Sequence, residues 1–343
     1  MTEIAASAER SDEAGQEPIS GISVVVPIYN EIENIDLLCK ELTAALEPIG
    51  KHYEIVFVDD GSIDGSGEAL AEKARQDEHL RVIRFRRNYG QTAAMKAGLD
   101  FASQDAIVTI DGDLQNDPAD IAPMLAKLEE GYDLVHGWRR HRQDAMLNRK
   151  LPSMIANQLI SWSTGFPIHD LGCTLKVMRR ELVAEIELYG DMHRFIPLLL
   201  FERGARCVEM ETHHRPRLHG ETKYGIGRTF VVILDLLTVR FFLGNAGHPM
   251  MVFGGLGIFS FALSFVATMV TVIMKIWGGV DMTGNPFLLL SVLSALAGFQ
   301  LLSIGLIGEV LARVYFNQRG RKPYTVRQFL NFEDDSVAAG AAQ

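Results

Sequence analysis

The chain has 343 residues, of which 48% are hydrophobic and 22% are charged, so it can build a large core and is not a disordered chain. Its formal net charge of −10 at pH 7 disfavours a general affinity for nucleic acid. The three cysteines have no paired spacing, which excludes a disulfide scaffold and a Cys-x-x-Cys zinc site. No basic stretch followed by an apolar run opens the chain, so we expect no cleavable signal peptide.

From residue 21 onward, short β-branched apolar runs alternate with amphipathic segments. The runs predict strands over residues 22–27, 54–58, 82–85, 106–110 and 134–137. The segments between them predict helices over residues 37–46, 67–75, 91–101 and 120–130. This order predicts an α/β fold with a mainly parallel sheet, which binds ligands beyond the carboxyl ends of its strands. Neither a G-x-G-x-x-G motif after the first strand nor a G-x-x-x-x-G-K-[ST] motif occurs, so dinucleotide and P-loop sites are not expected.

Two acidic motifs follow strands of this predicted sheet. Asp59 and Asp60 end the second strand, where carboxylates can accept hydrogen bonds from a ribose or a base edge. Asp111 and Asp113 follow the fourth strand with a glycine between them, so both can turn toward one hard cation, and Gln115 adds a neutral oxygen. Such ligands suit Mg²⁺ or Mn²⁺, and a nucleotide diphosphate can fill the remaining positions. A plain polar turn is the alternative for either motif.

Other polar residues allow more than one interpretation. Asp170 lies in a polar loop, where it could orient or deprotonate an acceptor phosphate or only order the loop. The basic run from Arg139 to Arg142 suits phosphate binding, a solvated surface or attraction to anionic lipid. His213, His214 and His219 form no visible ligand quartet, so we expect no zinc site there.

Two long uncharged segments lie near the C-terminus. Pro249–Met274 and Pro286–Gly308 are long enough as helices, at about 1.5 Å per residue, to cross a hydrocarbon core of about 30 Å. Buried core helices are the alternative, although soluble helices of this length usually keep a polar face. Residues 151–164 and 226–243 are apolar segments that suit either membrane-surface helices or core packing.

Basic residues flank the two spans, whereas the connection between the spans holds a single lysine. They are Arg228 and Arg240 before the first span, and Arg313, Arg319, Arg321 and Lys322 after the second. Because cytoplasmic flanks are enriched in Lys and Arg, we expect both termini in the cytoplasm.

Seven motifs occur in an order and spacing that are specific as a set. They are Pro27-Ile28-Tyr29-Asn30-Glu31, Val58-Asp59-Asp60-Gly61-Ser62, Asn88-Tyr89-Gly90, Asp111-Gly112-Asp113-Leu114-Gln115, Gly137-Trp138-Arg139, Asp170-Leu171-Gly172-Cys173 and Arg217-Leu218-His219-Gly220-Glu221-Thr222-Lys223-Tyr224. The set resembles the GT-A-type inverting glycosyltransferases. With its two C-terminal spans, the chain resembles the polyprenyl-phosphate sugar synthases, the dolichol-phosphate-mannose-synthase-like and undecaprenyl-phosphate glycosyltransferase group.

This resemblance implies a nucleotide-sugar donor, a polyprenyl-phosphate acceptor, and Mg²⁺ or Mn²⁺ as cofactor. It assigns the nucleoside to Pro27, Tyr29, Glu31, Asp59 and Asp60, and the metal and diphosphate to Asp111, Asp113 and Gln115. It implies that Arg139, Arg217 and Lys223 hold phosphates. Thr222 stands where such motifs usually have Ser before the Lys, and it keeps the hydroxyl. The residues expected to carry the reaction are Asp113, Arg139, Asp170, Arg217 and Lys223.

We therefore expect a membrane-bound inverting glycosyltransferase that moves one sugar to a polyprenyl phosphate on the cytoplasmic face of the inner membrane. The expected donor is a UDP-sugar such as UDP-glucose, and a GDP-mannose-dependent synthase is the alternative. A processive polysaccharide synthase would need more spans and a Q-x-x-R-W motif, and the intact Asp, Arg and Lys set argues against a sensor without turnover. A homo-oligomer is left open.

The expected organisation has five parts. They are a disordered acidic N-terminus over residues 1–20, a GT-A catalytic domain over 21–225, an interfacial helix over 226–248, a transmembrane hairpin over 249–314 and a cytoplasmic tail over 315–343.

Overall fold

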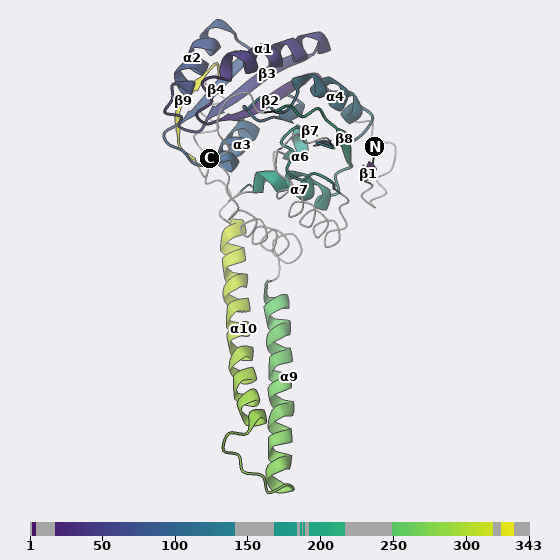
Figure 1. Ribbon diagram of the computed structural model, residues 1–343, viewed down its shortest axis with the longest axis vertical. Helices are drawn as coiled ribbons and strands as arrows, with labels where there is room; N and C mark the ends of the chain where they lie inside the picture. The colour runs from purple at the N-terminus through teal and green to yellow at the C-terminus, as the bar shows by residue number, and fades with distance from the viewer. Residues whose placement is uncertain are drawn as a thin grey trace. The chain divides into compact units, whose positions relative to one another are not determined.

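The structure is a computed structural model that describes residues 2–4, 18–140, 168–183, 186, 188, 192–216, 249–317 and 324–332. The chain divides into two compact units. One unit comprises Met1–Leu237 together with Lys322–Gln343, and the other comprises Thr238–Arg321. Figure 1 shows an α/β arrangement in the first unit and two long helices in the second.

A nine-stranded sheet forms the centre of the first unit, with the order β1-β8-β6-β7-β5-β2-β3-β4-β9 among the described strands. The strands are β1 (Thr2–Ile4), β2 (Gly21–Ile28), β3 (His52–Asp59), β4 (Leu80–Phe85), β5 (Ala106–Thr109), β6 (Leu134–Trp138), β7 (Lys176–Arg179), β8 (Cys207–Glu211) and β9 (Val326–Leu330). The pairs β2–β3, β2–β5, β3–β4 and β6–β8 are parallel. The mainly parallel α/β domain predicted from the sequence is thereby confirmed, and all five predicted strands are present.

Helices cover both faces of this sheet (Figure 1). On one face lie α1 (Ile35–Leu46), α2 (Ser66–Gln76) and α4 (Ile121–Glu129), and on the other lies α3 (Gln91–Phe101). Period-two alternation in β3 explains the division, because Ile55 and Phe57 pack with the first group while Val56 and Val58 pack with α3. Shorter helices are α6 (Arg180–Val183), α7 (Ile196–Glu202), η1 (Glu47–Ile49), η2 (Pro118–Asp120) and η3 (Met192–Phe195).

Strand direction determines which loops meet. The parallel strands β2, β3, β4 and β5 bring their carboxyl ends to one edge of the sheet. Strand β7 runs antiparallel to both β5 and β6, so β6 also ends at this edge and β7 begins there. The segment that precedes β7 therefore lies beside the loops that follow β5 and β6, which places residues 168–175 next to Asp111 and Arg139.

The structure departs from the expected organisation at both ends of the chain. Thr2–Ile4 pairs with β8 and Ile19 is buried, within the segment expected to be disordered. Val326–Leu330 pairs with β4 as strand β9, so part of the expected tail belongs to the catalytic sheet. Apolar residues drive this return, because Tyr324 and Phe329 join the cluster that covers α3. The expected interfacial segments at 151–164 and 226–248 lie outside the described residues.

The second unit contains α9 (Pro249–Ile276) and α10 (Pro286–Asn317), both long and apolar enough to cross a membrane. They pack closely where Gly257 faces Gly298, since a Cβ on Gly257 would lie 3.0 Å from the carbonyl oxygen of Gly298. Only 22% and 17% of their most apolar windows are buried, so most of this surface faces outward. Exposed side chains such as Phe259 and Leu306 thus favour a lipid environment over a soluble core.

Asn331, directly after β9, links the returning C-terminal segment to α2. Its Nδ2 donates hydrogen bonds to the carbonyl oxygens of Ala74 at 2.5 Å, Leu80 at 2.8 Å and Asp77 at 3.1 Å. The carbonyls of Ala74 and Asp77 belong to the end of α2, where a helix leaves acceptors unpaired, and that of Leu80 belongs to the first residue of β4. The φ of Asn331, 59°, is a left-handed conformation that Asn tolerates better than most residues.

We predict that Asn331→Ala lowers the free energy of unfolding by about 1–3 kcal/mol, because the carbonyls lose a shared donor and the left-handed backbone gains strain. Thermal unfolding of the full chain in detergent measures this loss. Asn331→Gly is the matched variant, since it removes the donor but tolerates the backbone conformation, and it should lose less. Wild-type stability in both variants would show that the Asn331 contacts do not hold the segment in place.

Candidate active site

The Asp111–Gln115 turn follows β5 at the shared carboxyl edge, as the sequence predicts. A Cβ on Gly112 would lie 2.4 Å from Cδ1 of Ile28 at the end of β2, so a larger residue there would have to displace this buried side chain. Leu114 adopts a left-handed φ of 59° while its side chain is buried. The turn is therefore pressed against β2, and it presents Asp111 and Asp113 from a tight backbone.

Neutral donors hold both oxygens of Asp111. Gln91 Nε2 donates to Oδ1 at 2.8 Å, and Thr174 Oγ1 donates to Oδ2 at 2.8 Å. Asn116 Nδ2 in turn donates to Thr174 Oγ1 at 3.0 Å. Burial and the neighbouring Asp113 carboxylate raise the pKa of Asp111 to about 6. The two carboxylates are thus close enough to repel each other, and a cation between them would relieve the repulsion.

The donor set fits a hard divalent cation. Asp111 and Asp113 offer carboxylate oxygens, and Gln115 offers an amide oxygen from the same turn. Within the part of the chain that the structure describes, no group of three or more His, Cys, Asp or Glu side chains is placed to hold a metal. An ion at this turn would therefore need further oxygens, which a bound diphosphate can provide.

The first two motifs form one continuous surface beside this turn. The backbone N–H of Asn30 donates to Ser62 Oγ at 2.9 Å, and that of Asp60 donates to the carbonyl oxygen of Ile28 at 2.9 Å. Pro27, Tyr29 and Glu31 are partly buried along it. The loops after β2 and β3 thus meet as predicted, and the sheet edge places them next to the Asp111–Gln115 turn.

Asp59 and Asp60 differ in their contacts. Asp59 Oδ1 accepts from the backbone N–H of Ser62 at 2.9 Å, and its Oδ2 lies 3.4 Å from Arg84 Nε. Asp60 accepts from the backbone N–H groups of Tyr89 at 2.6 Å and Gly90 at 2.9 Å. Burial raises the pKa of Asp60 to about 6 although these donors act to lower it. Asp59 thus orders its own loop, whereas Asp60 connects β3 to the loop before α3.

Arg139 and Asp170 form a two-bond ion pair. Arg139 Nε lies 2.8 Å from Asp170 Oδ2, and Nη2 lies 3.0 Å from Oδ1. Both side chains are largely buried, with exposed fractions of 11% and 7%. Although burial acts to lower it, the pKa of Arg139 is raised by the Asp170 carboxylate, so the guanidinium stays charged. The ion pair thus holds the positively charged Arg139 guanidinium in one orientation at the edge of the site.

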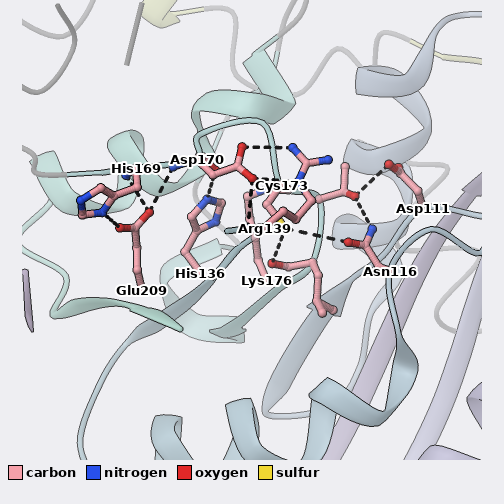
Figure 2. Close-up of polar contacts among 11 residues, drawn as sticks. Asp111, Asn116, His136, Arg139, His169, Asp170, Cys173, Lys176 and Glu209 are labelled. Carbon is pink, nitrogen blue, oxygen red and sulfur yellow. Dashed lines mark hydrogen bonds and ion pairs between the residues drawn. The ribbon is translucent and has the colours of Figure 1, made fainter. Parts of the chain in front are cut away.

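A buried glutamate orders the loop that carries Asp170. Glu209 on β8 accepts from the backbone N–H of His169 at 2.9 Å and from that of Asp170 at 3.4 Å. It also contacts His169 Nδ1 at 2.7 Å, and the His169 ring stacks on Trp138 at 4.4 Å. Figure 2 shows one continuous set of contacts from His169 and Glu209 through Asp170 and Arg139.

Lys176 adds a second buried cation. Its Nζ donates to the carbonyl oxygen of Cys173 at 2.5 Å, and burial lowers its pKa to about 8. His136 lies on the neighbouring strand with Nε2 at 2.6 Å from the carbonyl oxygen of Asp170, and burial lowers its pKa to about 3. The site thus combines Asp111 of the turn after β5 with Arg139 and Lys176, which lie on the same side near Cys173 (Figure 2).

Arg217 and Lys223 lie outside the described residues. The segment that leads to them touches the acidic turn, because the backbone N–H of Arg215 donates to the carbonyl oxygen of Gln115 at 2.8 Å. The Arg215 side chain pairs with Glu41 at 2.7 Å and Asp117 at 2.6 Å. Among the histidines of this segment, His213 Nδ1 lies 2.7 Å from Asp120 Oδ1.

The sequence interpretation missed several residues of this network. They are Gln91, Asn116, Thr174, Lys176 and Glu209. Gln91, Asn116 and Thr174 each directly follow a motif that was identified, which was the available signal. Lys176 and Glu209 gave no such signal, because they lie within β7 and β8, strands that the apolar pattern did not predict.

Known proteins of one family resemble this chain. Residues 23–187 match glycosyl transferase family 2. A dodecaprenyl-phosphate galacturonate synthase from Rhizobium johnstonii is 41% identical over 321 residues, which covers 92% of this chain and 94% of that protein. An undecaprenyl-phosphate 4-deoxy-4-formamido-L-arabinose transferase from Shewanella sediminis is 38% identical over 313 residues, with 91% and 93% covered.

Among solved structures, glucosyl-3-phosphoglycerate synthase from Mycobacterium tuberculosis matches with a TM-score of 0.50 and 21% identity. The match covers 67% of this chain and 82% of that one, and at this identity it supports the fold alone. The two relatives above align over almost their whole length, including the region of the two apolar helices. The chain therefore belongs to glycosyl transferase family 2, and it is a glycosyltransferase of the polyprenyl-phosphate group.

Proposed function

We propose that this chain transfers one sugar, with inversion, from a nucleotide-diphosphate sugar to a polyprenyl phosphate. The observation that carries this proposal is that the acidic Asp111–Gln115 turn and two buried cations lie at one edge of the sheet, where Arg139 pairs with Asp170 and Lys176 donates to the Cys173 carbonyl oxygen. The relatives are named for transfer of galacturonate and of a formamido-arabinose to polyprenyl phosphates, which supports the same acceptor class. Two apolar helices would hold the chain at the membrane where such an acceptor lies.

The chemistry needs charge neutralisation more than a strong base. A lipid monophosphate is largely ionised near pH 7, so its oxygen can attack the sugar C1 directly. The bond from C1 to the nucleoside diphosphate breaks, and a single displacement inverts the anomeric centre. A divalent ion bound at Asp111, Asp113 and Gln115 would stabilise the negative charge of the departing diphosphate.

The cations then have separate tasks. We assign Arg139 to phosphate binding. We assign Asp170 to the orientation of the Arg139 side chain, because both Asp170 oxygens accept from the guanidinium. A carboxylate engaged in this way is a poor base, so the orienting role is favoured over deprotonation. We assign Arg217 and Lys223 to the acceptor phosphate, which the contact of nearby Arg215 with the acidic turn supports.

The donor is proposed to be a UDP-sugar, with UDP-glucose tested first and GDP-mannose as the alternative. The experiment incubates the full chain in detergent with a short polyprenyl phosphate, Mn²⁺ and a panel that adds UDP-galacturonic acid. Mass spectrometry of the lipid should show the addition of one sugar from one donor. A ladder of products would instead indicate a processive synthase, and no lipid product from any donor would contradict the proposal.

In that assay, Asp113→Asn should lower the rate of transfer about a hundredfold or more, because one charged ligand for the ion and diphosphate is lost. Asp36→Asn is the matched control, since it makes the same change at an exposed carboxylate on α1 and should leave the rate unchanged. An Asp113→Asn rate within threefold of wild type would exclude the acidic turn from the reaction.

We propose that the chain lies in the inner membrane with both flanks of its hairpin in the cytoplasm. The connectivity of the chain supports the placement of both flanks on one side of the membrane, and the basic residues indicate that this side is the cytoplasm. Residues up to 216 and strand β9 belong to one folded unit, and α9 and α10 lie between them in sequence. A domain that contains both flanks must have them on the same side, so an even number of crossings is required.

We predict that a cysteine in place of Trp277 reacts with an impermeant maleimide added to intact cells. Trp277 is 84% exposed in the connection between α9 and α10, and Gly279 is a poorer site because its φ of 58° disfavours a side chain. The three native cysteines are buried and should give little background. Arg10→Cys, the control, should react only after permeabilisation, and the opposite pattern would reverse the orientation.

A further inference from the structure

The C-terminal segment, residues 324–332, is part of the donor side of the domain although it follows the second apolar helix. Tyr324 is buried, its ring stacks on Phe85 at 5.0 Å, and its hydroxyl donates to Asp100 Oδ2 at 2.9 Å. Asp100 lies in the last turn of α3, where Lys96 Nζ holds its other oxygen at 2.5 Å. The segment is thereby anchored to both β4 and α3.

The same segment contacts the 86–90 loop, which joins β4 to α3. The backbone N–H of Arg86 donates to the carbonyl oxygen of Thr325 at 3.2 Å. The Tyr89 ring packs edge-on against Phe85 at 5.6 Å, so Phe85 is shared between Tyr324 and Tyr89. Hydrogen bonds from the side chain and backbone of Thr325 lower the pKa of the Tyr89 phenol. Thr325 therefore contacts the loop near both of its ends, and Tyr324 contacts Phe85, which directly precedes the loop.

The opposite side of this loop holds Asp60, one of the carboxylates that the family resemblance assigns to the donor nucleoside. The backbone N–H groups of Tyr89 and Gly90 donate to the two oxygens of Asp60. Gly90 needs its φ of 94° to direct that N–H, and α3 begins at the next residue, Gln91, which donates to Asp111. The position of the loop thus determines where Asp60 lies and where the helix that contacts Asp111 begins.

We propose that Tyr324 and Thr325 are positioning residues for the nucleotide end of the donor, acting through Tyr89 on Asp60. The inference rests on the proposed function, since it assumes a nucleotide donor at this edge. Asp60 is buried and can keep its charge only while the two N–H groups point at it. A loop released from the C-terminal segment would have to be ordered when the nucleotide binds, which weakens binding.

The test measures binding of UDP and of GDP to the full chain in detergent by calorimetry, beside donor and acceptor kinetics. The variants are Tyr324→Phe and Thr325→Val, which remove hydroxyls while they keep the ring and the strand. Each should raise the Kd of the bound nucleotide and the donor KM about threefold to tenfold, as expected for one lost hydrogen bond. The acceptor KM and kcat should stay within twofold of wild type.

Tyr89→Phe provides the second line of the test. If Thr325 acts through the Tyr89 hydroxyl, the double variant Tyr89→Phe/Thr325→Val should bind nucleotide no more weakly than either single variant. If the increases in nucleotide Kd of the two single variants multiply in the double variant, Thr325 does not act through the Tyr89 hydroxyl. The comparison does not depend on a disruptive change, because each variant removes only a hydroxyl or exchanges it for a methyl group.

Asn331→Ala is the matched control within the same segment, because Asn331 contacts α2 and not the 86–90 loop. It should lower the unfolding temperature without changing the nucleotide Kd. The inference would be overturned if Tyr324→Phe and Thr325→Val bound nucleotide like wild type. It would also be overturned if the nucleotide Kd rose in proportion to the loss of stability in both Asn331→Ala and Thr325→Val. A wild-type chain that binds neither nucleotide would instead overturn the proposed function.

Discussion

The rest of the site is arranged around the Asp111 carboxylate and its neighbour Asp113, which one turn places at the shared edge of the sheet. Burial and this neighbour raise the pKa of Asp111 to about 6, so two negative charges at this turn are unfavourable without compensation. Gln91 and Thr174 supply neutral donors, while Arg139 and Lys176 supply buried positive charge nearby. A divalent ion and the diphosphate of a donor would complete the charge balance of the proposed site.

The parallel sheet makes this arrangement possible because it collects the ends of distant strands. The loops after β2, β3, β4 and β5 reach one edge, and the antiparallel strand β7 brings Asp170 and Thr174 to it from the opposite direction. Glu209 on β8 then orders the Asp170 loop. The C-terminal segment extends the sheet as β9, and it also contacts α3 and the loop that holds Asp60. Residues on both sides of the two apolar helices therefore belong to one domain.

The sequence predicted the elements whose burial has a regular pattern. The strands that became β2 to β6 contain short, mainly apolar runs, and the acidic motifs follow two of them. Strand β7 has no such pattern, because Lys176 and Arg179 are charged yet buried, and β8 carries Glu209 and Glu211. Asp170 was recognised as a polar loop residue. Its ion pair with Arg139 became evident only once β7 was placed between β5 and β6. Strand β9 was not predicted, and Arg327 and Gln328 interrupt its apolar residues.

The most direct test of the two-carboxylate site is the affinity of the full chain for Mn²⁺ with and without a nucleoside diphosphate. Within the described residues the turn has too few ligands for tight binding alone, so free Mn²⁺ followed by electron paramagnetic resonance should fall strongly only when UDP or GDP is present. A mixture of Mn²⁺ and nucleotide without protein provides the baseline, and Asp113→Asn should return the signal to that baseline. Mn²⁺ that binds equally well without a nucleotide, or that binds the Asp113→Asn protein as it binds wild type, would contradict this account.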